Sequence, residues 1–157
     1  MIKLTDRIWI GGSTDEMSIE VTRLRITGLL NVAQDLQGMR GWGYYIDYAQ
    51  TGLIDGPGNP PSAYCAAILM LHTLIDRHDR VMVFCHNGGR SLAVATMYLI
   101  IKRGKVSDHP TFLNYWTPWD KMLDELAKTA EQPLPEPHRA HRRGFDKLPL
   151  ALLESLV

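Results

Sequence analysis

The 157-residue chain has only two cysteines, Cys65 and Cys85, too few for the disulfide network that staples small secreted domains. It also lacks net charge, since 17 Lys and Arg balance 17 Asp and Glu, and no overall field draws it to a membrane or a nucleic acid. Its longest near-apolar run, residues 92–101, is too short to span a bilayer, and its first residues lack the apolar core of a secretory signal. We therefore expect a cytoplasmic protein that has no membrane partner and binds its ligands at local sites. Nucleic acid is not the expected ligand, and the sequence leaves the oligomeric state open.

The hydrophobic content of 45 % is enough to build a core in a chain of this length. The sequence shows no internal repeat and no low-complexity tract that would divide it. We expect a single domain over residues 1–157.

Short apolar runs alternate with helical patterns along the first 104 residues. Strands are predicted over 7–12, 29–33, 44–51 and 80–84, and helices over 13–28, 62–76 and 92–101. In the first of these helices Thr14 is the expected cap and Gly28 the expected end, and Ser62 is the expected cap of the second. This alternation predicts an α/β fold with a central, mostly parallel sheet flanked by helices.

The remainder, residues 105–157, is predicted to be largely helical. Helical patterning resumes at about Ser107, and a surface helix is expected to begin at Pro118. Residues 132–144 form a proline-punctuated basic segment that we interpret as an extended connection, and residues 147–157 are expected to form a final short helix.

The stretch "VMVFCHNGGRS", residues 81–91, places a cysteine at the end of an apolar strand and an arginine at the start of a helix. In a parallel sheet, ligands bind beyond the carboxyl ends of the strands. The backbone amides of residues 86–91 and the helix N-terminus can form a nest for an oxyanion. The phosphate-binding candidates are therefore His86, Asn87, Gly88, Gly89 and Arg90, whose guanidinium can hold an oxyanion through two parallel hydrogen bonds.

The same donors favour the thiolate form of Cys85, which can then attack a bound phosphate as a nucleophile. Ser91 can hydrogen-bond the sulfur and ease its later departure. The leaving oxygen needs an acid, and Asp55, in the loop "IDGPGNPPS" after another candidate strand, is our choice. The alternatives are that Cys85 is a packing residue at a strand end, Arg90 a surface helix-start residue and Asp55 an ordinary turn residue. Asn59 is interpreted as a turn residue, with a role in fixing the acid loop as the alternative.

These segments resemble the cysteine-based protein phosphatases. "VFCHNGGRS" resembles their signature loop, and "LIDGPGNPP" resembles the general-acid loop of their small dual-specificity branch. "TDRIWIGG" and "GLLNVAQDL" resemble that branch's opening strands, so the resemblance covers about residues 5–104. It implies Cys85 as nucleophile, Arg90 as phosphate ligand, Ser91 as thiolate partner and Asp55 as general acid, with no metal and no cofactor. The implied partner is a phosphorylated protein or a small phosphomonoester.

The sequence departs from that family at two positions. Phe84 stands where the family has a histidine before the cysteine, and only four residues separate Cys85 from Arg90 where the family has five. A lost loop residue can remove one donor to the transition state, which costs about 10² to 10³ in rate. Two other interpretations follow: a pseudophosphatase that binds phosphorylated partners without turnover, and a sulfurtransferase similar to rhodanese, whose active loop is shorter.

Several other residues have an ordinary interpretation beside a functional one. The run "HRAHRR", residues 138–143, is read as a solvated connection, with an H-x-x-H metal site or a basic dock as alternatives. Cys65 is read as a packing residue, with a protective disulfide as the alternative. Two sets of aromatic residues are candidates for different roles. Trp42, Tyr44 and Tyr45 can line a phosphotyrosine pocket, whereas Tyr115, Trp116 and Trp119 are expected to cover the core.

Overall fold

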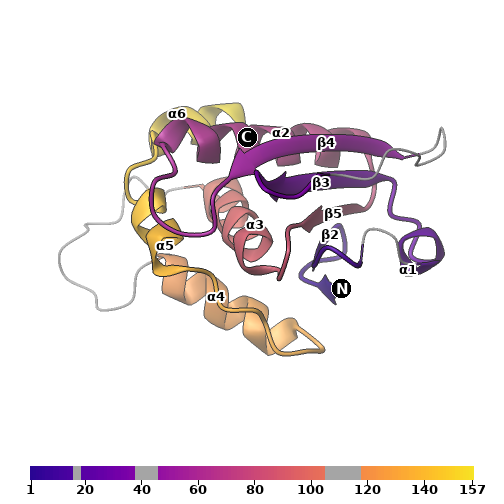
Figure 1. Cartoon of the computed structure of the whole chain (residues 1–157). Coiled ribbons are helices and arrows are strands. Elements are labelled where there is room, and N and C mark those ends of the chain that lie inside the picture. The colour runs from indigo at the N-terminus through magenta and orange to yellow at the C-terminus, as the bar shows by residue number, and fades with distance from the viewer. Residues whose placement is uncertain (16–18, 38–45, 105–117) are drawn as a thin grey trace.

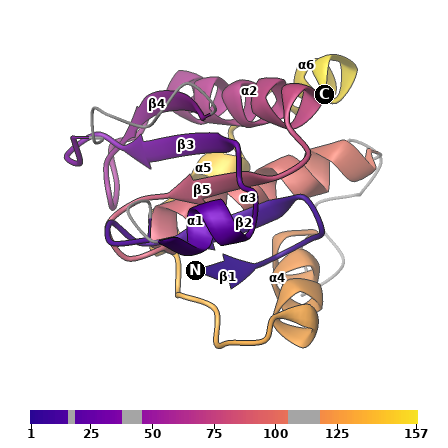
Figure 2. The same ribbon diagram turned by 90° about the vertical axis from the view of Figure 1, so that its right-hand side faces the viewer.

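A five-stranded sheet forms the centre of the molecule. The computed structural model describes residues 1–15, 19–37, 46–104 and 118–157. The strands are β1 (Ile2–Lys3), β2 (Ile8–Gly11), β3 (Gly28–Ala33), β4 (Asp47–Leu53) and β5 (Val81–Phe84). Their order is β1-β2-β5-β3-β4, which Figure 2 shows from the bottom of the sheet to the top. All neighbours are parallel except β1 and β2, so the predicted mostly parallel sheet is confirmed, with β5 at its centre.

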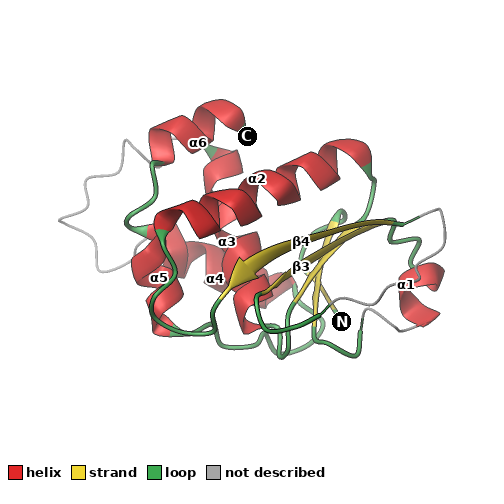
Figure 3. Cartoon of the chain, turned by 45° about the horizontal axis from the view of Figure 1, so that its top comes forward, coloured by secondary structure: helices red, strands yellow, loops and turns green. Residues whose placement is uncertain are grey.

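Helices flank this sheet. They are α1 (Ile19–Arg23), α2 (Pro61–Arg77), α3 (Gly89–Arg103), α4 (Pro118–Thr129), α5 (Arg139–Phe145) and α6 (Leu150–Leu156). In Figure 1 the arrowheads of β3 and β4 point toward α5, and α1 lies beyond the opposite end of these strands. Figure 3 shows the same division, with α5 and α6 toward one side of the molecule and α1 at the other.

The apolar residues of the central strands alternate between two hydrophobic clusters, as the pleat of a strand requires. Val81 and Val83 belong to the larger cluster, which also takes in α2, α3 and the C-terminal helices. Met82 and Phe84 belong to the smaller cluster, which includes Val21 of α1. Because β5 is buried on both faces, its four residues are continuously apolar, and this is the pattern from which a central strand was predicted.

Two predicted boundaries are wrong. Gly28 does not end a helix, because α1 stops at Arg23 and Gly28 is already the first residue of β3. Ser62 does not cap α2, which begins one residue earlier at Pro61 and has Pro60 as a cap with no side-chain hydrogen bond. Proline is well suited to the first helical position, where its missing N–H would have no acceptor in any case.

The prediction of an extended connection over 132–144 is wrong in its second half. Residues 139–145 form α5, and the side chain of His138 accepts a hydrogen bond from the amide of Ala140 at its start. The other predicted strands and helices are confirmed to within a few residues at their ends, and β1 is an addition. The helical patterning predicted from Ser107 lies outside the described residues, as do Glu16, Met17 and Ser18 of the first predicted helix and the start of the strand predicted over 44–51. No helix in the described part of the chain has the length and apolarity needed to cross a membrane.

Candidate active site

Cys85 lies directly after β5, where the chain turns into α3, and its side chain is 1 % exposed. The turn is made by Gly88, the cap of α3, at φ 85°, a left-handed conformation that glycine adopts without strain. The loop rests on the residues that follow β2: the amide of Cys85 donates to the carbonyl of Gly11 at 3.3 Å, and that of Ser13 donates to the carbonyl of His86 at 3.1 Å. The loop is therefore anchored at its strand end by backbone hydrogen bonds.

Six consecutive backbone amides, those of residues 86–91, donate to no carbonyl and no side chain within the described residues. Backbone N–H groups in proteins nearly always have an acceptor, and an oxyanion is an acceptor that several amides can share. The amides of Gly89, Arg90 and Ser91 also belong to the first turn of α3, where the helix supplies no acceptor and carries partial positive charge. This loop retains the unpaired donors that an anion nest needs.

Ser91 is fully buried, and its Oγ lies 3.7 Å from the sulfur of Cys85. Its hydroxyl hydrogen is directed to the carbonyl of Gly88, at an Oγ to O distance of 2.8 Å. A hydroxyl has one hydrogen, so in this arrangement Ser91 can accept from a thiol but cannot also donate to a thiolate. Stabilising the Cys85 thiolate would require the hydroxyl to rotate away from Gly88.

Arg90 is 2 % exposed and its guanidinium is fixed at one nitrogen. Nη1 donates to Oδ1 of Asp35 at 2.6 Å and to the carbonyl of Leu53 at 2.8 Å. Nε and Nη2 make no hydrogen bond to any residue in the described ranges, so this edge of the guanidinium is free for a bidentate ligand. The contact with Leu53, the last residue of β4, also joins the cysteine loop to the segment that carries Asp55.

Asp35 is the acidic partner of the cysteine loop, and the sequence analysis missed it. Its hydrogen bond with Arg90 lowers the pKa of the Asp35 carboxyl, and its second oxygen lies 3.2 Å from Nε2 of His86. The available signal was its place just after β3, at the same edge of the sheet as Cys85. Arg90 lies in the first turn of α3, where the helix carries partial positive charge, so a nearby anion stabilises it. The carboxylate of Asp35 is such an anion.

His86 is thus held by Asp35, whereas the side chain of Asn87 is exposed and has no partner in the described ranges. Gly88 and Gly89 lie against the segment that precedes α5. A methyl group added at Gly88 would lie 3.0 Å from Cγ of Pro135, and one added at Gly89 would lie 3.2 Å from the carbonyl oxygen of Glu136. The paired glycines permit both the turn and this close packing.

Asp55 is two residues beyond Leu53, in a loop that the side chain of Asn59 organises. Asn59 accepts from the amide of Ile54 at 2.8 Å and donates to the carbonyls of Ile54 and Gly56 at 2.8 and 3.2 Å. Asn59 therefore fixes the loop rather than simply occupying a turn. The carboxyl of Asp55 is 57 % exposed, and its Oδ1 lies 3.8 Å from Nε2 of His141.

His141 comes from α5 and is fully buried, with Nδ1 2.8 Å from the hydroxyl of Tyr64 in α2. The solvated connection predicted over 138–143 is wrong at this residue, whose ring faces inward to the loop of Asp55. The rings of His138 and His141 are 6.3 Å apart, and in the described part of the chain no three His, Cys, Asp or Glu side chains gather as metal ligands.

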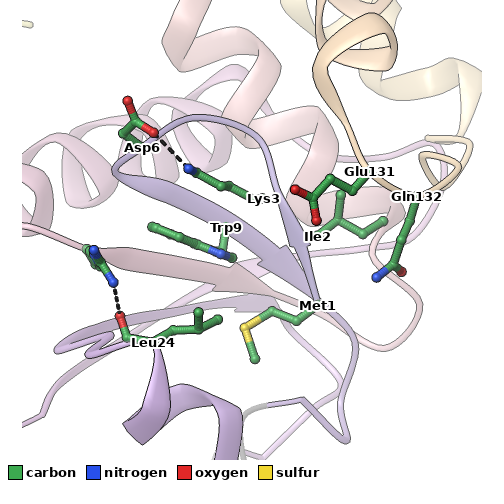
Figure 4. A pocket seen from close by; sticks show the side chains of 9 residues that line it. Met1, Ile2, Lys3, Asp6, Trp9, Leu24, Glu131 and Gln132 are labelled. Carbon is green, nitrogen blue, oxygen red and sulfur yellow. Dashed lines mark hydrogen bonds and ion pairs between the residues drawn. The ribbon is translucent and has the colours of Figure 1, made fainter.

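Two hollows lie elsewhere on the surface. One, of about 290 Å³, is formed by the loop of Asp55 and α5, and its basic lining residues are His138, Arg143 and Lys147. The other, of about 450 Å³, lies beside Trp9 (Figure 4). Arg80, which also lines it, precedes β5, so this hollow is at the opposite end of that strand from Cys85. There Lys3 pairs with Asp6 at 2.7 Å, and Arg80 donates to the carbonyl of Leu24 at 2.6 Å, so both cations are engaged.

The remaining candidates add little to the site. Trp119 is buried against Phe145, with ring centroids 6.0 Å apart, and covers the core as predicted. Cys65 is a free thiol in α2, and burial raises its pKa. The other aromatic residues considered above, Trp42, Tyr44, Tyr45, Tyr115 and Trp116, lie outside the described residues.

Comparison with solved structures identifies the fold. The chain is similar to DUSP15 (18 % identity, 98 % of this chain and 90 % of the other, TM-score 0.73). It is also similar to human DUSP28 (18 % identity, 99 % of each chain, TM-score 0.70). A third similar structure is that of a mouse putative dual specificity phosphatase in complex with zinc tungstate. It is 19 % identical, the match covers 98 % of this chain and 89 % of the other, and the TM-score is 0.74. No protein-family model and no curated protein sequence matches the chain. The chain therefore has the fold of the cysteine-based dual-specificity phosphatases, as the sequence resemblance predicted.

Proposed function

We propose that this protein hydrolyses phosphomonoesters, with a phosphorylated protein or a small phosphate ester as substrate, through a phosphocysteine intermediate. One observation carries the proposal: within the described residues, six amides of residues 86–91 and one edge of the buried Arg90 guanidinium have no hydrogen-bond partner, and they adjoin the buried Cys85. Loop, arginine and cysteine together form a cradle for a tetrahedral dianion with a nucleophile next to it. The dual-specificity phosphatase fold supports this interpretation.

The first step transfers the phosphoryl group to sulfur. The Cys85 thiolate forms a bond to phosphorus while the bond from phosphorus to the ester oxygen breaks, and protonated Asp55 gives its proton to that oxygen. The loop amides and Arg90 hold the equatorial oxygens as charge spreads over them. Ser91 rotates its hydroxyl from Gly88 toward sulfur.

The second step returns the enzyme to its starting state. Water attacks phosphorus, the Asp55 carboxylate accepts the proton of that water, and the sulfur–phosphorus bond breaks. Cys85 leaves as a thiolate that Ser91 and the loop amides stabilise, and inorganic phosphate is released.

The experiment is hydrolysis of p-nitrophenyl phosphate in EDTA by the wild type, Cys85→Ser and Arg90→Lys. We expect turnover that vanadate inhibits, its loss in Cys85→Ser, and a fall of about 10² to 10³ in kcat for Arg90→Lys, since lysine cannot reproduce the bidentate contact. Turnover that survives in Cys85→Ser would falsify the mechanism. Cys65→Ser is the matched control and should keep wild-type turnover.

The ion pair between Arg90 and Asp35 favours a second candidate, a pseudophosphatase that binds phosphorylated partners, because it offsets part of the positive charge of the cradle. The same experiment separates the two. Folded wild type that gains thermal stability from vanadate but shows no turnover supports the binding protein. If instead the wild type transfers sulfur from thiosulfate to cyanide, the sulfurtransferase interpretation is correct.

A further inference from the structure

The buried histidine of α5 has an unsatisfied nitrogen that faces the proposed general acid. His141 is 0 % exposed, and its Nε2 has no hydrogen-bond partner in the described part of the chain. Leaving a buried polar nitrogen unpaired costs free energy, so such groups call for a structural or functional reason. The carboxyl of Asp55 lies 3.8 Å from this nitrogen, about 1 Å beyond hydrogen-bond length. A small movement of the exposed Asp55 side chain would complete the bond.

The partner on the other side of the ring determines which nitrogen carries the proton. The Tyr64 hydroxyl lies 2.8 Å from Nδ1, and burial raises the pKa of Tyr64, which keeps its O–H available as a donor. When Tyr64 donates to Nδ1, the proton of the neutral imidazole resides on Nε2 and points at Asp55.

The surroundings favour the neutral form of this ring. Burial lowers the pKa of His141, and the positive charge of Arg90 and the neighbouring His138 act in the same direction, partly offset by Asp55. A neutral ring with its proton on Nε2 is a hydrogen-bond donor toward Asp55, not a cation that competes for the phosphate.

We propose that His141 is a positioning residue for Asp55, which it orients by donating a hydrogen bond from Nε2 to Oδ1. This inference rests on the proposed phosphatase function. In the first step Oδ1 accepts from His141 while Oδ2 carries the proton that goes to the leaving oxygen. As that proton departs, negative charge develops on the carboxylate, and the bond from Nε2 becomes charge-assisted and therefore stronger. Tyr64 fixes the tautomer, and Asn59 holds the loop that presents the acid.

The chemistry of the leaving group distinguishes this role from a purely structural one. Phenyl phosphate has a poor leaving group that needs an acid, whereas p-nitrophenolate departs readily without one. A defect in the acid therefore appears on phenyl phosphate and largely disappears on p-nitrophenyl phosphate. General damage to the protein lowers both rates alike.

The experiment measures kcat/KM, which reports the first step and not hydrolysis of the phosphocysteine, on both substrates for the wild type, Asp55→Asn, His141→Leu and the double variant. Asp55→Asn should lose about 10² to 10⁴ on phenyl phosphate. His141→Leu should lose about 10- to 100-fold there, the worth of one hydrogen bond to a charged group. On p-nitrophenyl phosphate His141→Leu should stay within about threefold of the wild type, and Asp55→Asn should lose far less than it loses on phenyl phosphate. The double variant should be no slower than Asp55→Asn, and His141→Gln, which keeps a donor, should recover part of the loss.

Two further variants protect the test against a loss of folding. Tyr64→Phe removes only the hydroxyl and should show the same dependence on leaving group with a smaller loss, and it decides the question if His141→Leu does not fold. Phe145→Leu loosens the same helix without touching the hydrogen bonds and should slow both substrates equally.

This inference is overturned if the His141 and Tyr64 variants lose equal activity on the two substrates while the wild type is active and Asp55→Asn is impaired mainly on phenyl phosphate. That result leaves the proposed function standing. A folded wild type with no turnover on either substrate overturns the proposed function, and the role of His141 with it.

Discussion

Among single residues, Asp35 sets both the orientation and the effective charge of Arg90. The arginine is buried and needs an acceptor, and Asp35 supplies one at 2.6 Å while remaining 62 % exposed itself. Because solvent screens that carboxylate, it fixes the guanidinium without fully cancelling its charge. An oxyanion can approach the opposite edge, formed by Nε and Nη2.

Asp35→Asn tests this balance. Asparagine keeps an acceptor for Nη1 but removes one negative charge near the cradle, so vanadate should bind about two- to fivefold more tightly, as expected for one screened charge. Inhibition constants for vanadate, or its thermal protection of the Cys85→Ser protein, measure the change. Asp76→Asn is the control, since Asp76 pairs with His72 within α2, and its vanadate affinity should stay at the wild-type value. Weaker vanadate binding in Asp35→Asn would show that orienting Arg90 matters more than the charge.

At the scale of elements, α5 is the piece that completes the site. It packs against α2 and α3, and its His141 reaches the loop of Asp55. The contact with α2 depends on Gly144, where an added methyl group would overlap the ring of Tyr64, at 2.4 Å from Cε2. The absence of a side chain there lets the helix approach closely enough for His141 and Tyr64 to bond.

Gly144→Ala should therefore force the two helices apart and lower the free energy of unfolding by about 1–3 kcal/mol, the usual cost of overpacking. Urea denaturation followed by circular dichroism measures the loss. Gly52→Ala is the matched control: a methyl group there would lie 3.7 Å from Gln34, an ordinary contact, so stability should change by about 0.5 kcal/mol or less. Equal stabilities for the two variants would show that α5 adjusts without strain.

At the scale of the whole molecule, one apolar cluster joins the sheet to the C-terminal helices. Val83 of β5, Leu92 of α3, Trp119 of α4 and Phe145 of α5 all belong to it. The segment before α5 also packs on the glycines of the cysteine loop. This continuity supports our proposal that residues 1–157 fold as a single domain.

If that proposal is right, the chain unfolds in one cooperative step. Urea transitions followed by far-ultraviolet circular dichroism and by tryptophan fluorescence should then share one midpoint. Phe145→Ala should lower the free energy of unfolding by about 3–5 kcal/mol. Both midpoints should therefore fall together. Two separate transitions, with only one of them sensitive to Phe145→Ala, would mean that the C-terminal helices fold independently of the sheet.

Local sequence was enough to predict the centre of the fold. The apolar run of β5, the glycines after Cys85 and the helix that follows are neighbours in the chain, so their geometry depends on nearby residues. Predictions failed where a short segment could not bury its apolar face alone. Residues 139–145 have the composition of a solvated connection, and they form α5 because Phe145 and His141 are buried against distant elements.

Local sequence alone places a cysteine, six potential donor amides and an arginine after a buried strand, because strand, loop and helix are encoded within twenty residues. The residues that face this loop come from distant parts of the chain and are brought there by the packing of the fold. Asp35 reaches Arg90 from 55 residues earlier, and His141 reaches Tyr64 from 77 residues later. Pairings over such distances depend on how helices and strands pack, which no local pattern specifies, and they decide how Arg90 is held and which residue faces Asp55.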